Sequence, residues 1–384
     1  MSVPKLRFKE FDGDWSAQKY KDALTIKYGK DHKLLEDGEI PVYGTGGVMR
    51  YVNQYLYDGE SILIGRKGTI DQPKYVNEKF WTVDTLFYSE IKQNIYPLFI
   101  YQHALQVNWL GLNEATGVPS LNTTSINNVD IYLPSKEEQT KIASFLCAVD
   151  EKISQLTQKH ALLTQYKQGM MQKLFSQQIR FKADDGSEFG EWGKAKVGNI
   201  TETIFGYPFD SKEMVEDNNG IPLMRGINIG ECHIRHSFEL DRFFLKDTSK
   251  LEKYFVRVND IVLSMDGSKV GRNSAFVTEK DAGSLLVQRV CILREKENTN
   301  IQYVYQWIIS KEFHRYVDQV KTSSGIPHIS GKQIQDYEIS YPCLEEQTKI
   351  ANFLSAIDQK IEVVTQQIEQ AKTWKKGLLQ QMFV

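Results

Sequence analysis

Cysteine is scarce in this chain of 384 residues, and the four that occur lie far apart, at Cys147, Cys232, Cys291 and Cys343. A disulfide-stapled fold needs several closely spaced cysteines and a structural zinc site needs paired ligands, so the sequence predicts neither. Among the histidines, only His233 and His236 lie close together, and an alternating strand would place them on opposite faces. We expect no metal ion, and reduced thiols as in cytoplasmic proteins.

Long apolar runs are also absent, and no segment approaches the ~18 residues that a membrane span needs. The opening segment MSVPKLRFKE is polar and charged, unlike a secretory signal. There is no excess of basic residues either: 47 Lys and Arg stand against 49 Asp and Glu, a net charge of −2. We therefore expect a cytoplasmic protein, and not a non-specific DNA binder that depends on phosphate charge alone. A binder whose basic residues cluster on one face, or which shares DNA with a partner, remains compatible.

Catalytic motifs are missing as well. The chain has no D/N-P-P-Y/F loop, no glycine-rich S-adenosylmethionine fingerprint and no G-x-x-x-x-G-K-S/T phosphate loop. The glycine-rich segments 44–47 and 65–68 fit neither nucleotide pattern, so we interpret them as tight turns that expose backbone and basic side chains. We expect no catalytic residues and no cofactor in this chain.

What the chain does have is an internal repeat. Residues 117–176 align without gaps on residues 325–384, at a constant offset of 208. The heptapeptide EEQTKIA at 137–143 recurs at 345–351, and about 24 of the 60 aligned positions are identical. The chain is therefore an internal duplication.

Each shared block predicts a long helix with a coiled-coil seam. Apolar residues alternate at steps of four and three over about five heptads. The rows in the first block are Ile142, Val149, Leu156, Leu163 and Met170, beside Leu146, Ile153, His160, Lys167 and Leu174. Their counterparts are Ile350, Ile357, Val364, Ala371 and Leu378, beside Leu354, Ile361, Ile368, Lys375 and Met382.

The start of each helix carries its own signal. Ser135 with Glu138 predicts a capping box, and Cys343 replaces the serine in the second copy. About 40 residues at ~1.5 Å each give helices near 60 Å long. The polar residues His160, Lys167 and Lys375 interrupt the seam, where such residues can fix register or partner choice.

The blocks between the helices read as mixed α/β. Short apolar strands end in Gly and charged turns, and segments 95–105 and 302–317 have helical spacing. The two blocks echo each other faintly: 7–15 resembles 180–192, 40–48 resembles 221–229, and 60–68 resembles 260–268. Each block returns through a Gly-x-Pro loop and a strand into its long helix.

A duplicated domain-plus-helix unit most simply packs about a pseudo-twofold axis, with antiparallel helices and a domain at each end. Two binding surfaces at fixed separation suit duplex DNA, whose backbone has twofold symmetry. Since the two domains differ in sequence, the target would be split and asymmetric.

The layout and the PxxEEQTKIAxFLxxxD segment that opens each helix resemble the specificity subunit of type I restriction–modification systems. The resemblance implies an α+β fold with target-recognition domains at 1–134 and 179–342 and long spacer helices at 135–178 and 343–384. It also implies that two adenine-N6 methyltransferase subunits dock on the helices and that a restriction subunit can join. S-adenosylmethionine and ATP would then lie on those partner subunits.

Direct reading of bases needs Arg, Lys, Asn or Gln side chains, supported by contacts to phosphate. We select the loops 43–50 and 65–72 of the first domain and the matching loops of the second. The candidate DNA-binding residues are Tyr43, Thr45, Arg50, Arg66, Lys67, Thr69, Arg225, Asn228, Lys269, Arg272 and Asn273. Phe145 and Phe353, beside the seam, are candidate contacts for the methyltransferase, or else pack against the chain's own domains.

Two rival interpretations remain. The first is a DNA methyltransferase or nuclease with a divergent site; the absence of its motifs argues against it, and binding of S-adenosylmethionine by the purified chain alone would test it. A coiled-coil scaffold that never touches DNA explains the helices and the mild acidity. It does not explain why two large domains diverged while their helices stayed alike.

Overall fold

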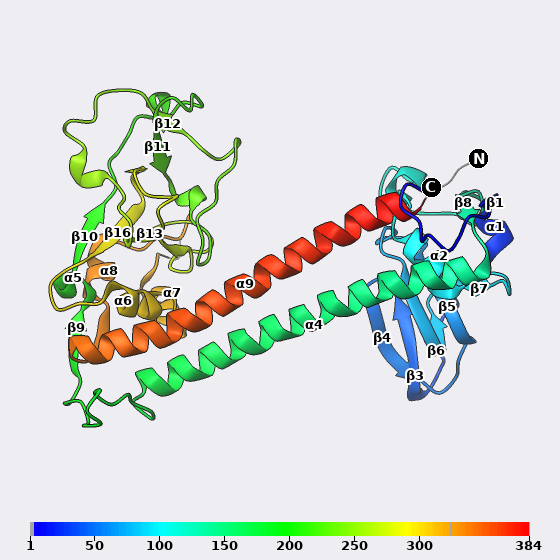
Figure 1. Cartoon of the computed structure of the whole chain (residues 1–384), viewed down its shortest axis with the longest axis horizontal. Helices are drawn as coiled ribbons and strands as arrows, with labels where there is room; N and C mark the ends of the chain where they lie inside the picture. The colour runs from blue at the N-terminus through cyan, green and yellow to red at the C-terminus, as the bar shows by residue number, and fades with distance from the viewer. Residues whose placement is uncertain (1–3, 323–324, 384) are drawn as a thin grey trace. The chain divides into compact units, whose positions relative to one another are not determined.

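A computed structural model describes residues 4–322 and 325–383. Residues 1–3, 323–324 and 384, which include the extreme ends of the expected first domain and last helix, lie outside the described residues. The chain divides into two compact units, Met1–His160 with Val364–Val384 (unit 1) and Ala161–Val363 (unit 2). The two long helices, α4 (Lys136–Phe175) and α9 (Leu344–Met382), each contribute residues to both units (Figure 1).

Unit 1 is built on a six-stranded sheet in the order β2-β7-β5-β6-β3-β4, with β1 and β8 paired separately. Its elements outside the long helices are β1 (Ser16–Lys19), α1 (Tyr20–Ala23), β2 (Leu24–Tyr28), β3 (Asp37–Gly44), β4 (Gly47–Val52), β5 (Tyr57–Gly65), β6 (Lys74–Thr82), β7 (Leu86–Ile91), α2 (Pro97–Ala104), the 3-10 helix η1 (Trp109–Leu112), α3 (Thr123–Asn127) and β8 (Asp130–Leu133).

The strand β5 shows why this sheet lies between two cores. Ile62 and Ile64 point to the core that contains α2 and the start of α4, whereas Leu63 points to a second core on the other side of the sheet. All three side chains are fully buried. A strand buried on both faces carries a continuous apolar run, as this one does.

Unit 2 has a four-stranded sheet β10-β16-β13-β14, a three-stranded sheet β12-β11-β15 and the pair β17-β9. Its elements outside the long helices are β9 (Gly193–Lys196), α5 (Val197–Ile200), β10 (Thr201–Phe205), η2 (Ser211–Glu213), β11 (Ile221–Met224), η3 (Gly226–Asn228), β12 (Phe243–Phe244), η4 (Glu252–Tyr254), β13 (Ile261–Ser264), β14 (Ser274–Phe276), β15 (Leu285–Leu286), β16 (Val290–Glu295), α6 (Ile301–Ile308), α7 (Lys311–Val320), α8 (Gly331–Asp336) and β17 (Glu338–Tyr341). The helix expected over 302–317 is two helices, because the hydroxyl of Ser310 caps a new one by accepting the N–H of Phe313 (3.2 Å).

The long helices α4 (Lys136–Phe175) and α9 (Leu344–Met382) have the predicted seam. Every seam position named above is buried or half-buried. In unit 1 the start of α4 packs with the end of α9, so the two halves run in opposite directions. In the described parts of the chain, no helix is both long and apolar enough to cross a membrane.

The charged seam residues are paired in the same way in both units. Lys167 binds Asp358 at 2.5 Å within unit 2, and Lys375 binds Asp150 at 2.7 Å within unit 1. Both lysines and both aspartates are related by the repeat offset of 208 residues. The pairing supports the view that the polar seam positions specify helix register.

The start of each long helix is anchored by a buried carboxylate. Arg7 donates two hydrogen bonds to Glu138, at 2.7 Å each, and Arg180 donates to Glu346 at 3.0 and 2.7 Å. The expected capping box is therefore only half formed: the Ser135 hydroxyl accepts the N–H of Glu138, but the Glu138 carboxylate turns to Arg7. The paired arrangement confirms the duplication in three dimensions.

A buried histidine makes unit 1 sensitive to acid. Burial lowers the pKa of His103 to about 4, and its ring shares a 2.9 Å hydrogen bond with the Tyr20 hydroxyl. Between pH 6.5 and 4 the unfolded chain binds a proton at this histidine that the folded chain does not. The free energy of unfolding should therefore fall by about 3 kcal/mol as the pH drops through this window.

Urea unfolding of the full chain at a series of pH values measures this effect. The variant H103Q serves as the control, because it retains a polar side chain without the titrating ring. Equal slopes of stability against pH in the two proteins would contradict the assignment.

Candidate nucleic-acid interface

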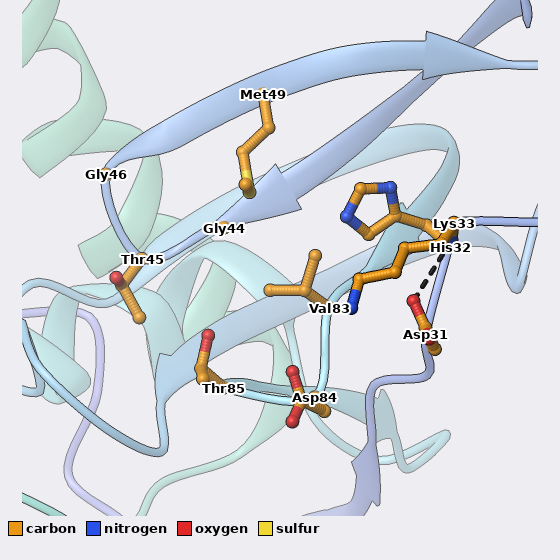
Figure 2. Close-up of a pocket in the computed structure, with 10 residues that line it drawn as sticks. All are labelled: Asp31, His32, Lys33, Gly44, Thr45, Gly46, Met49, Val83, Asp84 and Thr85. Atoms are coloured by element: carbon orange, nitrogen blue, oxygen red, sulfur yellow. Dashed lines mark hydrogen bonds between the residues drawn. The ribbon is translucent and has the colours of Figure 1, made fainter.

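The loop 43–50, one of the two that the sequence marks in unit 1, lines an open hollow of about 600 Å³. Figure 2 shows its walls, which come from the segment before β3, the end of β3 with the turn after it, Met49 of β4, and the turn between β6 and β7. The lining residues are Asp31, His32, Lys33, Gly44, Thr45, Gly46, Met49, Val83, Asp84 and Thr85.

The second glycine-rich loop lies beside this hollow. The backbone N–H groups of Arg66 and Lys67 both donate to the Thr85 carbonyl, at 2.9 and 3.2 Å. Gly68, with φ of +90°, donates to the carbonyl of Pro119 in the Gly-x-Pro loop at 2.9 Å. The structure thus brings the loops 43–50 and 65–72 together as tight turns, in keeping with the interpretation of their glycines.

The candidate side chains of unit 1 differ in their exposure and in whether they already have a partner within the protein. Lys67 is exposed, and Arg66 is held over the Tyr28 ring at 5.4 Å with one hydrogen bond to the Asp84 carbonyl (3.1 Å). Thr45 lines the hollow, and Thr69 is half-buried behind it.

Tyr43 and Arg50 are occupied within the sheet. Tyr43 donates to the carboxylate of Glu78 at 2.5 Å, and burial, together with that carboxylate, raises the pKa of Tyr43 to about 12. Arg50 forms an ion pair with Asp37 at 2.5 Å. Each would have to exchange these partners to contact DNA.

Unit 2 contains a second hollow, of about 370 Å³, lined by Arg225, Gly226, Ile227, Arg235, Ser264, Asp266, Gly267, Ser268, Lys269, Asn273, Val287, Gln288 and Arg289. Three candidates from the sequence are among them: Arg225, Lys269 and Asn273. Four basic side chains face one carboxylate in this lining, so the hollow favours an anionic partner.

The other two candidates of unit 2 have structural partners. Asn228 is 2% exposed, and its amide donates to Asp241 at 3.0 Å, so it holds the loop together and has no free edge for a base. Arg272 forms a two-pronged ion pair with Asp318 at 3.2 and 2.5 Å. Burial and the nearby Arg242 lower the pKa of Arg225 from its usual value, and Lys269 pairs with Glu231 on the surface at 3.0 Å.

The two hollows occupy equivalent positions in the duplicated fold. The N–H of Val83 donates to the Tyr43 carbonyl at 3.1 Å, and the N–H of Val287 donates to the Met224 carbonyl at 3.0 Å. In unit 1 this bond joins the turn after β6 to the parallel strand β3. In unit 2 it joins the turn after β15 to the parallel strand β11. The correspondence of 40–48 with 221–229 is therefore confirmed.

The correspondence of 60–68 with 260–268 is wrong by one residue. Gly68 donates to Pro119, and the residue that donates to the matching Pro327, at 3.0 Å, is Gly267 and not Ser268. Counting apolar residues back from Gly68 and from Gly267 gives the observed register, so the sequence did contain the signal for this shift.

The turns Val83–Asp84–Thr85 and Val287–Gln288–Arg289 were not among the candidates from the sequence. Each lines its hollow, and Asp84, Gln288 and Arg289 are exposed. The only shared sequence signal is a valine after an apolar strand, which is too common to single out a site. Arg235, which also lines the second hollow, was likewise not among the candidates from the sequence.

Phe145 and Phe353 pack within their own units. Phe145 contacts the rings of Phe8 and Trp374 edge-on, at centroid distances of 5.8 and 6.0 Å. Phe353 contacts Phe181 at 5.8 Å. Both are half-buried, as the plainer of the two alternatives expects.

Comparison with known proteins gives a family. The model for the type I restriction modification DNA specificity domain matches residues 13–165 and 191–373. The MjaVIII type I restriction enzyme specificity subunit of Methanocaldococcus jannaschii is 26% identical over 97% of this chain and 94% of its own length. The crystal structure of a type I S subunit from M. genitalium has a TM-score of 0.67 at 14% identity and covers 100% of this chain and 99% of its own. A second structure, from work on complex assembly of the type I R-M system, has a TM-score of 0.53 at 14% identity, covering 96% and 97%.

Proposed function

Because this chain belongs to the type I restriction–modification DNA specificity family, we propose that it reads a two-part, asymmetric duplex target, one half-site with each unit. The chain is a specificity subunit and has no catalytic activity of its own. The observation that carries the proposal is the pair of hollows at equivalent positions with different linings. Equivalent surfaces with different side chains suit half-sites that differ in sequence.

The side chains assigned to DNA are the candidates that line a hollow or lie on the loop 65–72 beside the first one. In unit 1, Lys67 and Arg66 contact the duplex with Thr45 and Thr69 beside them. In unit 2, Arg225, Lys269 and Asn273 do so. Tyr43, Arg50, Asn228 and Arg272 support these loops through the contacts described above. The basic lining of the second hollow supplies local charge that the chain as a whole lacks.

The helices supply the surfaces for partners. We propose that two adenine-N6 methyltransferase subunits dock on the repeated helix segments, near Phe145 and Phe353, and that a restriction subunit joins them. Two copies fit a duplicated chain, because each copy would meet the same heptapeptide and the same Lys–Asp pair. S-adenosylmethionine and ATP would be bound by those partners.

The test is a map of N6-methyladenine in a host that expresses this chain with its methyltransferase, compared with a host that lacks the chain. One split motif with a constant gap is expected. No new methylation from an assembled complex would favour the scaffold interpretation instead.

A double substitution probes the unit 1 loop. Arg66→Ser with Lys67→Ser should weaken binding to the target duplex by about tenfold or more, since two cations leave the interface, and should hardly change thermal stability. Lys79→Ser with Lys21→Ser removes the same charge from exposed positions outside the hollow. Equal losses of affinity in the two variants would place the loop away from DNA.

A further inference from the structure

The turn before β7 in unit 1 and the turn before β16 in unit 2 share one backbone frame. Besides the Val83 and Val287 bonds, the Thr85 carbonyl accepts the N–H of Arg66 at 2.9 Å, and the Arg289 carbonyl accepts that of Met265 at 2.8 Å. The first residue of each turn, a valine, is therefore held by a parallel strand, β3 or β11. The third residue is held by the segment that follows β5 or β13, beside the hollow. Such a frame holds side chains in place without depending on their identity.

A glycine on the neighbouring strand end lets the chain pass close to this turn. A Cβ on Gly29 would lie 2.0 Å from the Val83 carbonyl oxygen, and a Cβ on Gly206 would lie 2.0 Å from that of Val287. Because the nearest atoms belong to the backbone of the turn, a side chain at either glycine could be accommodated only by moving that backbone. The position of both turns is thus set by close packing as well as by hydrogen bonds.

Within this common frame the side chains differ completely in chemistry. Unit 1 presents Asp84 and Thr85, whereas unit 2 presents Gln288 and Arg289 at the same two positions. Arg289 also has φ of +75°, in the left-handed region that L residues other than Asn and Asp rarely adopt. A strained backbone held open to solvent beside a hollow is a feature of functional positions.

The acidic residue Asp84 indicates whether these two positions contact the DNA backbone or the base edges. A position that contacts the DNA backbone would be basic or neutral in both units, because a carboxylate is repelled by phosphate. An exposed Asp84 is compatible with a base edge, where a carboxylate accepts a hydrogen bond from an exocyclic amino group. The Gln amide can both accept from and donate to the major-groove edge of adenine, and the Arg guanidinium can donate twice to that of guanine.

We infer that these two positions determine the base sequence that each unit reads, an inference that rests on the proposed function. Gln288 and Arg289 read purine edges in the half-site of unit 2. Asp84 and Thr85 read a base with an exposed amino group in the half-site of unit 1. The basic side chains around them hold the phosphates and set the position of the duplex.

The experiment exchanges the pair while the frame stays in place. Gln288→Asp with Arg289→Asn gives unit 2 an acidic and a neutral polar side chain, as in unit 1, and Asn tolerates the positive φ at position 289. The full chain is expressed with its methyltransferase for N6-methyladenine mapping. The half-site of unit 2 should change or relax at one or two positions, with discrimination falling by about 10- to 100-fold there. The other half-site and the gap should stay as they are.

Arg289→Gly separates recognition from folding. Glycine adopts a positive φ readily, so this variant should melt at the same temperature as the unchanged chain or above it, yet lose base discrimination. Arg257→Thr is the charge-matched control: Arg257 is exposed before β13, whereas the hollow lies after that strand. Its motif should be unchanged.

The outcomes separate the two proposals. If the unchanged chain directs methylation to a split motif and both Arg289→Gly and the exchanged pair retain that motif, the assignment of these positions is overturned and the proposed function stands. Relaxation of both half-sites by the unit 2 exchange would also overturn it. If the unchanged chain itself gives no motif, the proposed function fails, and this inference fails with it.

Discussion

Replacing Arg180 by methionine is expected to lower the free energy of unfolding of unit 2 by about 3–5 kcal/mol. The Glu346 side chain is fully buried and accepts hydrogen bonds from Arg180 and from the indole N–H of Trp192 at 2.8 Å. Without the guanidinium this buried carboxylate loses its counterion and two hydrogen bonds. A loss of that size is a large fraction of the stability of a typical domain.

Urea unfolding of the full chain measures the effect, and a nearby pair supplies the control. Lys349 binds Asp184, whose side chain is 93% exposed, so water screens this pair and Lys349→Met should cost far less than Arg180→Met. Changing Glu346 to Gln in the Arg180→Met background should recover part of the loss, because the buried group is then neutral. A cost for Arg180→Met as small as the control's would show that the pair does not anchor the helix.

Replacing Phe175 by alanine is expected to cost a further large amount, about 3–5 kcal/mol. The Phe175 ring stacks on that of Trp307 with centroids 3.9 Å apart and an interplanar angle of 11°, and it is 8% exposed. It joins the last turn of α4 to α6, so its removal leaves a cavity at the point where the helix meets the domain. The end of α4 should then exchange its amide protons faster.

The duplication provides a matched variant in the other unit. Phe383 packs against Phe99 at a centroid distance of 5.1 Å, so Phe383→Ala should destabilise unit 1 and leave the end of α4 protected. Leu162→Ala, at a side chain that is 58% exposed, is the control for a change on the helix surface. Uniform loss of protection over the whole chain in Phe175→Ala would argue against a local anchor.

The long helices and the duplication could be predicted from the sequence because their signals are local or repeated. The heptad rows place Ile142 and Leu146 in the core whatever the rest of the chain does, and the constant offset pairs them with Ile350 and Leu354. The family resemblance rests on the same segments. Local periodicity therefore sufficed for the long helices, whereas the family and its fold class came from the resemblance of these segments to known specificity subunits.

The loops beside the hollows were only partly predictable. Glycines at 44–47 and 65–68 indicated tight turns, and the structure brings these turns together. Whether a given basic side chain is available depends on its neighbours: Arg272 is held by Asp318 of the helix α7, and Arg50 by Asp37 of the adjacent strand β3. A sequence without those contacts cannot distinguish an occupied arginine from a free one.

The turns at 83–85 and 287–289 were decided by the tertiary structure alone. They correspond because each donates to and accepts from segments far along the chain, such as Tyr43 and Arg66 in unit 1. Insertions between those segments change the offset from one part of the domain to the next, so no ungapped alignment joins them. The sequence by itself determined the helices, the repeat and the absence of catalytic motifs, since these depend on residues close together or on an exact repeat. Only the folded chain could decide which side chains share a hollow, because that depends on hydrogen bonds between residues that the sequence places far apart.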